Sequence, residues 1–225
     1  MPASLEVRMS HLPFTSRPAP EVSRVAHKQR IRPTQQRAVQ MRRTLLDAAL
    51  HLLEERGAQR LTTTAIVERA HVSTGTFYRY FNDKAEIITA LRDEAVAAVD
   101  RDLREAVVRA LDLSLDDAVR EIVATLVTGF EQHGPVVLAM VDAQPGGSNA
   151  NVLPEIERDL FQLAAVIPRR HLPDVPPERL EALVFMTMGV VVATALRIAL
   201  FRPPGSDREA LVDVATTMLV AGLRS

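Results

Sequence analysis

Apolar residues recur every three or four positions along most of the chain, which is the spacing of one face of an α-helix. The first such stretch begins at Thr34 and ends before Gly57, a residue type that often terminates helices. The pattern predicts one amphipathic helix here, with these residues on its inner face: Ala38, Met41, Leu45, Ala48, Ala49, Leu52 and Leu53.

Two short helices are predicted to follow, only a few residues apart. The threonines at 62–64 supply hydroxyl groups that can cap the first of them, which extends to Ala70. Ser73 can cap the second, which extends to Tyr80. The apolar residues inside this pair are Ile66, Val67 and Ala70 in the first helix, Val72 in the turn, and Phe77 and Phe81 in the second.

Longer helices are predicted in the rest of the chain. Asn82 is placed to cap a helix that extends to about residue 109, and Ser114 to cap one that is stopped by Gly134. Another helix extends to Asp142, and residues 143–151 have the composition of a loop. No segment has the alternating pattern of a strand, so the predicted fold class is all-α.

The last two helices begin with recognisable signals. Pro176 and Pro177 open the first of them, and Ser206 with Glu209 matches the S-x-x-E capping box at the start of the second. The pattern places five residues on the inner face of that final helix: Leu211, Ala215, Met218, Leu219 and Gly222.

The segment Leu183–Phe201 contains 19 residues with Arg197 as the only charge, which is close to the length that spans a bilayer. Against a membrane span, polar residues dilute the run, and no basic flank or aromatic belt borders it. A helix is also apolar on all sides when one face packs on its own core and another on a partner subunit. Because Gly189 and Ala193 permit close approach of two backbones, we interpret the segment as a dimer-interface helix.

Composition limits the kinds of protein this chain can be. Its 225 residues include no cysteine, which excludes disulfides and thiolate chemistry and fits a reducing cytoplasm. The start of the chain lacks the pattern of a secretory signal, so we expect a cytoplasmic protein. No dinucleotide, phosphate-loop or nucleophile-elbow motif is present, and the six histidines have no metal-ligand spacing. We therefore predict no enzyme activity, no cofactor and no metal.

Charge is distributed unevenly along the chain. Residues 1–84 carry 14 Lys and Arg against 7 Asp and Glu, whereas residues 85–225 carry 13 against 21. A basic first third on an acidic remainder is typical of a head that binds a polyanion. Residues 1–33 hold five of the 14 prolines and no sustained periodicity, which predicts a flexible arm. Four cations precede the first helix and could follow a minor groove or merely be solvated: Arg24, Lys28, Arg30 and Arg32.

Residues 61–84 have the spacing of a helix-turn-helix, and their outward face is basic and rich in hydroxyl groups. The run Thr63-Thr64-x-Ile66-Val67-x-x-Ala70-x-Val72-Ser73-x-Gly75-Thr76-Phe77-Tyr78-x-Tyr80-Phe81-x-x-Lys84 resembles the signature of the TetR family of bacterial transcriptional regulators. The resemblance implies an all-α homodimer with a three-helix DNA-binding head at 34–84. It also implies a helical domain at 85–225 that binds a small effector and dimerises through Leu180–Phe201 and Leu211–Leu223.

The resemblance also implies which residues contact double-stranded operator DNA: Thr63, Thr64, Thr74, Gly75, Thr76, Tyr78, Tyr80 and Lys84. One position departs from the family pattern, because His71 occupies a turn position where glycine is common. Histidine tolerates a positive φ at some cost, so the turn is altered or His71 itself reaches the DNA.

The function implied is a ligand-responsive regulator, most simply a repressor, which a small apolar or aromatic effector releases from a palindromic operator. The alternative is a nucleoid or division factor of the same fold that has no effector. Candidate effector contacts are apolar or aromatic residues that could equally be core: Phe130, His133, Met140, Phe161, Phe185, Met186 and Met188.

Overall fold

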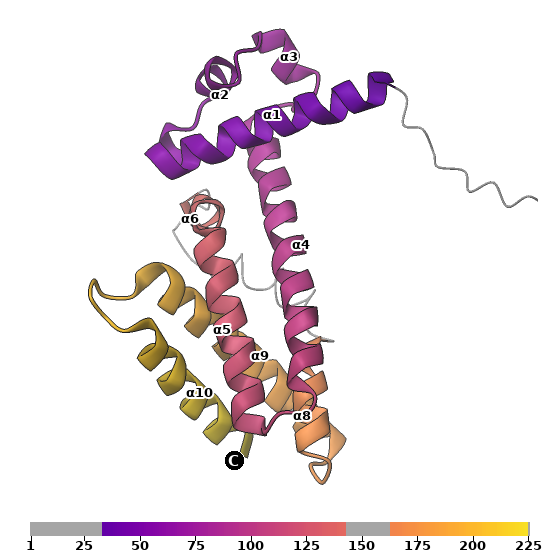
Figure 1. Ribbon diagram of the computed structural model, residues 1–225, viewed down its shortest axis with the longest axis vertical. Helices are drawn as coiled ribbons and strands as arrows, with labels where there is room; N and C mark the ends of the chain where they lie inside the picture. Colours follow the sequence, from indigo (N-terminus) through magenta and orange to yellow (C-terminus); the bar gives the residue numbers. More distant parts are fainter. Residues whose placement is uncertain (1–32, 143–162, 225) are drawn as a thin grey trace, which may run out of the picture.

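All the regular elements that the computed structural model describes, within residues 33–142 and 163–224, are helices (Figure 1). The predicted all-α fold class is therefore confirmed. In chain order the elements are α1 (Pro33–Arg56), the 3-10 turn η1 (Ala58–Arg60), α2 (Thr63–Arg69), α3 (Thr74–Tyr78), α4 (Lys84–Ala110), α5 (Leu115–Gln132), α6 (Gly134–Asp142), α8 (Val166–His171), α9 (Pro177–Phe201) and α10 (Arg208–Arg224).

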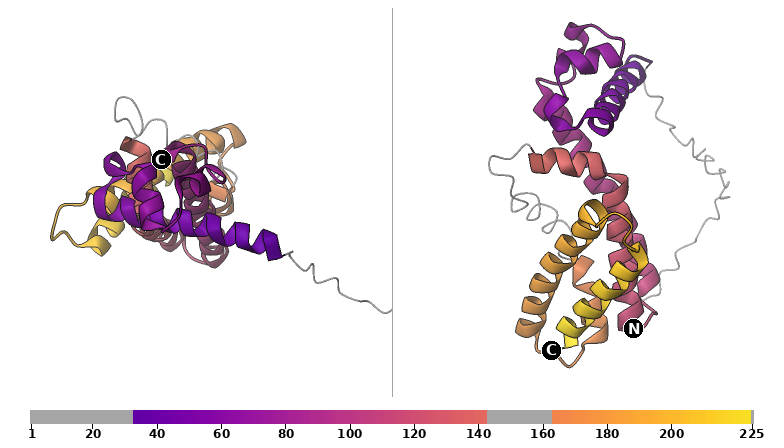
Figure 2. Two further views of the ribbon diagram at one scale, coloured as in Figure 1. Left: turned by 90° about the horizontal axis from the view of Figure 1, so that it is seen from above. Right: turned by 90° about the vertical axis from the view of Figure 1, so that its left-hand side faces the viewer.

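The molecule is elongated, with a small head at one end of a helical body. Figure 1 shows α1, α2 and α3 in the head and α4 running from the head along the whole body. In the second view of Figure 2, α9 and α10 form an antiparallel pair on one side of the body. Because α4 belongs to both parts, it is a direct mechanical link between them.

The core of the head is built mainly from α1 and the two short helices. Leu45 and Ala49 of α1 are buried there with Phe77 of α3. The first turns of α4 add Ile87, and α6 adds Val136. The head core thus includes residues on both sides of position 84, and α6 joins the body to the head a second time.

The body packs around α5, which contacts α4, α9 and α10. Its buried face includes Val123 and Leu126, which are 0% and 2% exposed. Gly129 allows α5 to lie close to α4, because a Cβ atom there would be 3.0 Å from a methyl carbon of Val99. The resulting apolar core continues into the inner faces of α9 and α10.

Three predicted helix caps are confirmed. The hydroxyl oxygens of Thr62, Ser73 and Ser114 each accept a hydrogen bond from the backbone N–H three residues later, at 3.1, 3.2 and 3.2 Å. These bonds satisfy N–H groups that a helix leaves without partners in its first turn. Gly57 ends α1 as predicted, with a φ of 72°.

Another predicted helix start is wrong by one residue. Asp83, not Asn82, caps α4, because its carboxylate accepts from the Glu86 N–H at 2.8 Å. Asn82 instead donates its backbone N–H to the Glu86 carboxylate at 2.6 Å. The charged acceptor is the stronger one beside a helix N-terminus, so it takes the cap position. The predicted stop of α5 before Gly134 and the helix that follows to Asp142 are confirmed.

The capping box predicted at Ser206 does not form. The Ser206 hydroxyl donates to the carbonyl oxygen of Pro203 at 2.7 Å, and the Glu209 N–H donates to the Asp207 carboxylate at 2.9 Å. The Glu209 carboxylate is engaged by Arg120 of α5 at 2.8 Å instead. The Asp207 carboxylate therefore takes the capping role predicted for Ser206, and the Glu209 carboxylate forms a tertiary ion pair.

The inner face of α10 is also rotated from the predicted one. Leu219 is buried as predicted, but Met218 is 68% exposed and Gly222 is exposed. The buried set also includes Val212 and Leu223. Core packing therefore buries a face of α10 that leaves Val214 and Met218 exposed, and Arg120 of α5 forms ion pairs with Glu209 and Asp213 of this helix.

Candidate nucleic-acid interface and ligand cavity

The segment α2–turn–α3 has helix-turn-helix geometry and is supported from below by α1. The Phe77 ring is buried and lies 5.8 Å from the Phe81 ring, centroid to centroid. An ion pair between Arg69 of α2 and Glu55 of α1 ties the first short helix to α1. The hydrogen bond from Arg69 lowers the pKa of the Glu55 carboxyl, so this pair stays charged at neutral pH.

None of the eight predicted DNA-contact residues is buried. Five of them are exposed, namely Thr64, Thr74, Gly75, Tyr78 and Lys84, and three are half-buried, namely Thr63, Thr76 and Tyr80. They come from the start of α2, from α3 and the two residues after it, and from the start of α4. The fold thus leaves these side chains available on the head, while their contact with DNA stays a prediction.

Gly75 and Tyr78 lie on the part of α3 that is accessible from outside the head. A Cβ atom at Gly75 would meet only the Ser73 hydroxyl oxygen, at 3.9 Å, so the fold itself has room for a side chain there. A glycine in open space permits close approach of another molecule to the helix backbone. Tyr78 is 56% exposed, and its ring stands edge-on to Phe77 with centroids 5.5 Å apart.

Lys84 has an internal partner in this structure. Its ammonium group donates to the carbonyl oxygen of Leu61 at 3.3 Å, just before α2 begins. This bond ties the N-terminus of α4 to the start of the helix-turn-helix. A lysine has two further donors that remain for a phosphate, so the predicted DNA contact is compatible with this bond.

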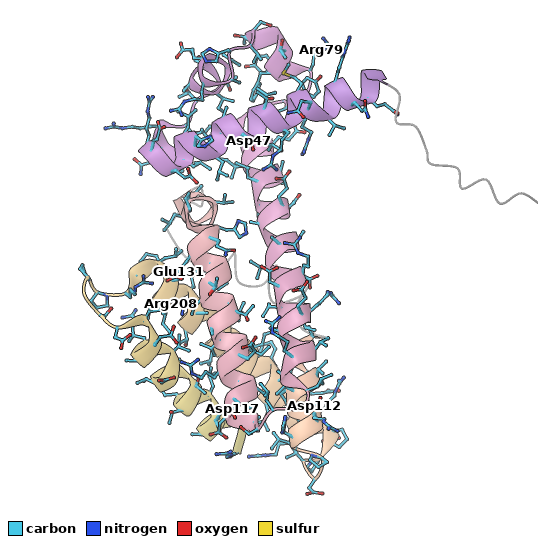
Figure 3. The ribbon with its side chains drawn as sticks, viewed as in Figure 1. Asp47, Arg79, Asp112, Asp117, Glu131 and Arg208 are labelled. Atoms are coloured by element: carbon cyan, nitrogen blue, oxygen red, sulfur yellow. The ribbon has the colours of Figure 1, made fainter. Side chains whose placement is uncertain are left out.

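Sequence reasoning did not include Arg79 among the DNA contacts. Arg79 follows α3 directly, is exposed, and its side chain makes no hydrogen bond or ion pair with the described residues. Figure 3 labels it on the outer surface of the head. An arginine adjacent to a hydroxyl-rich helix is a signal that the sequence already contained.

An apolar cavity of about 80 Å³ lies in the body between α4, α5, α8, α9 and α10. Leu103 and Val107 of α4 form part of its wall, and Met188 of α9 forms another part. Thr187 contributes the one hydroxyl side chain among the lining residues, and none of them is charged. Burying a charge without a partner is costly, so this cavity suits an uncharged apolar group.

Of the five candidate effector residues whose side chains the structure describes, only Met188 lines this cavity. Met188 lines it, whereas Phe130 is buried elsewhere in the core and His133 is half-buried at the end of α5. Phe185 and Met186 are 61% and 62% exposed on the outer side of α9. The side chain of Met140 and the whole of Phe161 lie outside the described residues. The lining residues that the sequence did not single out are ordinary aliphatic residues, such as Leu103 and Leu219.

α9 is long and apolar enough to cross a membrane by those two criteria alone. In this structure its inner face packs against α5 and α10, with Val192 and Ala195 buried. Its outer face exposes Phe185, Met186 and Val190.

Among the described residues, no group of three histidines or carboxylates is arranged to hold a metal ion.

A helix-turn-helix with an exposed polar face, mounted on an all-helical body, defines a DNA-binding regulator. Residues 45–91 match the family model described as "Bacterial regulatory proteins, tetR family", and residues 114–223 match "Tetracyclin repressor-like, C-terminal domain". The chain belongs to the TetR family of bacterial transcriptional regulators, which is a family of regulators rather than enzymes.

Individual relatives agree with this assignment. The transcriptional regulator TtgR of Pseudomonas putida is 38% identical over 63 residues, which is 28% of this chain and 30% of TtgR. This chain therefore matches less than a third of that relative's length. A TetR-like transcriptional regulator from Rhodococcus sp. RHA1 has a TM-score of 0.56 at 19% identity, covering 82% of this chain and 96% of its own. FadR of Thermus thermophilus, a TetR-family repressor solved with lauroyl-CoA, has a TM-score of 0.53 at 22% identity, covering 80% and 94%. At these identities the two structures show a shared fold alone.

Proposed function

We propose that this protein is a repressor that binds a palindromic operator as a homodimer. A small apolar or aromatic effector then releases the repressor from the operator. One observation carries the proposal: α4 begins at the helix-turn-helix with Lys84 and forms part of the cavity wall with Leu103 and Val107. A single rigid element thus joins the candidate DNA interface to the candidate effector site.

The head supports DNA recognition by chemistry as well as by shape. Exposed hydroxyls at the start of α2 and in α3, such as Thr64 and Thr74, can bond phosphates or base edges. α3 is short enough to enter a major groove about 12 Å wide. A twofold dimer would present two such helices about 34–36 Å apart, which is one turn of DNA and implies a palindromic site.

The exposed stripe on α9 and α10 supports the proposed homodimer. Phe185, Met186 and Val190 of α9 are exposed, and so are Val214 and Met218 of α10. Several exposed large apolar residues on two helices that pack together are typical of a protein interface. Two copies of the α9–α10 pair, packed face to face, would bury it in a four-helix bundle.

Effector binding is supported by the apolar lining of the cavity, and the size of the cavity sets a condition on how an effector enters. The volume of about 80 Å³ is below the roughly 150 Å³ of an engineered protein cavity that holds benzene. A drug-sized ligand would need several hundred Å³. Such an effector must therefore displace part of the wall, and a shift of the α4 backbone at Leu103 or Val107 would move the head with it.

Release then follows from linkage. An effector that prefers a head spacing unsuited to the operator weakens DNA binding by the same factor by which DNA weakens effector binding. The FadR of Thermus thermophilus was solved with lauroyl-CoA, which contains a long apolar chain, and the lining of the cavity in this chain is apolar as well. Because a repressor acts on DNA, its place of action is the cytoplasm.

One experiment tests the function as a whole. The full chain is first used to select a duplex from a random-sequence pool, and lipophilic compounds are then screened for a rise in melting temperature. We expect a palindromic duplex and at least one compound that both raises the melting temperature and releases that duplex. Selection of a duplex that no compound releases would favour the nucleoid or division factor. Turnover of a compound would favour an enzyme.

A further inference from the structure

The N-terminal half of α1 projects beyond the rest of the head. Figure 1 shows α1 crossing the top of α4 and continuing past it, while the turn between α9 and α10 lies on the opposite side of the molecule. The view from above in Figure 2 shows the same opposition. Because α9 and α10 carry the proposed dimer face, this end of α1 points away from the twofold axis of the proposed dimer.

The projecting half of α1 is basic. Between residues 33 and 46 the chain carries three arginines and no acidic residue. One of them, Arg43, is held by Asp47 and Glu94, each at 2.8 Å. Arg37 is exposed and makes no hydrogen bond or ion pair with the described residues. Its charge is therefore available to an external anion.

Arg79 directly follows α3, which lies nearer than α2 to the N-terminal end of α1 (Figure 1). The guanidinium carbon of Arg42 is 5.3 Å from the centroid of the Phe81 ring, which places this turn of α1 beside the chain just after Arg79. Arg37 is five residues before Arg42, which puts it about 7.5 Å further along the helix and on a different face of it. Figure 3 shows Arg79 on the outer surface at the end of α3.

We propose that Arg37 and Arg79 form a distal edge that binds backbone phosphates of duplex DNA outside each operator half-site. The inference rests on the proposed DNA-binding function and adds that the bound DNA extends outward from each half-site. Arginine is well suited to phosphate because its planar group donates two parallel hydrogen bonds. Phosphate contacts position a protein and add affinity without reading bases. The protein therefore holds more DNA than the palindrome that it reads.

The test compares two duplexes that contain the site selected by the wild-type full chain. One duplex ends at the outer base pairs of the palindrome, and the other has arbitrary sequence added at both ends. We expect wild type to bind the longer duplex more tightly. In the Arg37→Ala/Arg79→Ala variant this advantage shrinks. The slope of log K against log salt also falls, by about 0.9 for each phosphate that is no longer neutralised, or about 3.6 for the four arginines of a dimer.

The control is Arg169→Ala, which removes an exposed arginine of α8 that also makes no ion pair with the described residues. It should leave both the slope and the preference for the longer duplex unchanged. A double variant that keeps the wild-type slope and length preference, while circular dichroism shows it folded, overturns the distal edge alone. A wild-type chain that selects no duplex overturns the proposed function and this inference together.

Discussion

The backbone N–H of Val72 donates to the carbonyl oxygen of Val67 at 3.0 Å and closes the end of α2. Between these residues, His71 donates its own N–H to the Glu68 carbonyl oxygen at 3.2 Å. This pair of bonds is the Schellman arrangement, in which the residue at the His71 position is left-handed and usually glycine. His71 has a φ of 54°, so the turn keeps its geometry at a cost in strain.

Replacing His71 with glycine should therefore stabilise the protein. Relief of the left-handed strain, about 1–2 kcal/mol, exceeds the extra backbone entropy that glycine loses on folding, so we expect a net gain of roughly 0.5–1 kcal/mol. Urea unfolding at neutral pH measures it. Gly57→Ala is the matched opposite, because its φ of 72° with ψ of 172° strains any side chain. A loss of stability in His71→Gly would mean that the imidazole makes a stabilising contact.

Tyr78→Ala and Thr76→Ala should each weaken specific operator binding by about 1–3 kcal/mol. Tyr78 is exposed, so its removal leaves the core intact and the melting temperature close to that of wild type. Thr76 also shares a hydroxyl–hydroxyl hydrogen bond of 2.9 Å with Ser73, so this variant loses a little stability as well. Fluorescence anisotropy at one fixed salt concentration is the measurement. Unchanged operator affinity in both variants contradicts the proposed interface.

Ala193→Glu should dissociate the proposed dimer. Ala193 is exposed on the outer face of α9, so a monomer tolerates the change, whereas an interface would bury an unpaired charge. We expect sedimentation to show a dimer for wild type at micromolar concentration and a monomer for the variant. Val108→Glu is the matched control, because Val108 is 68% exposed on α4 and lies outside the α9–α10 face. A dimeric, operator-binding Ala193→Glu variant would mean that the interface lies elsewhere.

Stability should depend on pH through His133. Burial lowers the pKa of this imidazole below 6.5, so the folded state binds its proton less readily than the unfolded state. The contribution of neutral His133 to the free energy of unfolding is therefore fully present above pH 6.5. It is lost as the pH falls towards the lowered pKa of the folded state. Unfolding free energies measured between pH 5 and 7.5 should rise with pH more steeply for wild type than for His133→Gln. Equal slopes would show that His133 is not responsible.

Enlarging the cavity should create a site that an apolar ligand can rescue. Leu126 lines the cavity and is 2% exposed, so Leu126→Ala should cost about 2–5 kcal/mol. Benzene should recover part of this loss in thermal unfolding. The control is Leu45→Ala, which truncates a leucine in the head core, away from the cavity. This variant should be destabilised, and benzene should not restore its melting temperature. Equal benzene effects in the two variants contradict a ligand-accessible cavity.

The sequence by itself determined the helices and the recognition motif. Helical periodicity and capping hydroxyls depend on residues within a few positions of each other, so Thr62, Ser73 and Ser114 could be identified as caps from local pattern alone. The packing of Phe77 and the exposure of Tyr78 follow from the same periodicity.

Only the tertiary structure decided what depends on packing between distant segments. A helix that is apolar all round, such as α9, does not reveal which stripe meets its own core, so Met188 and Phe185 could not be assigned to opposite sides from their spacing. The ion pairs of Arg120 with Glu209 and Asp213 join positions some 90 residues apart, which a local sequence pattern does not reveal. The cavity is likewise formed by five helices at once, because its walls consist of the same aliphatic residues that fill a core.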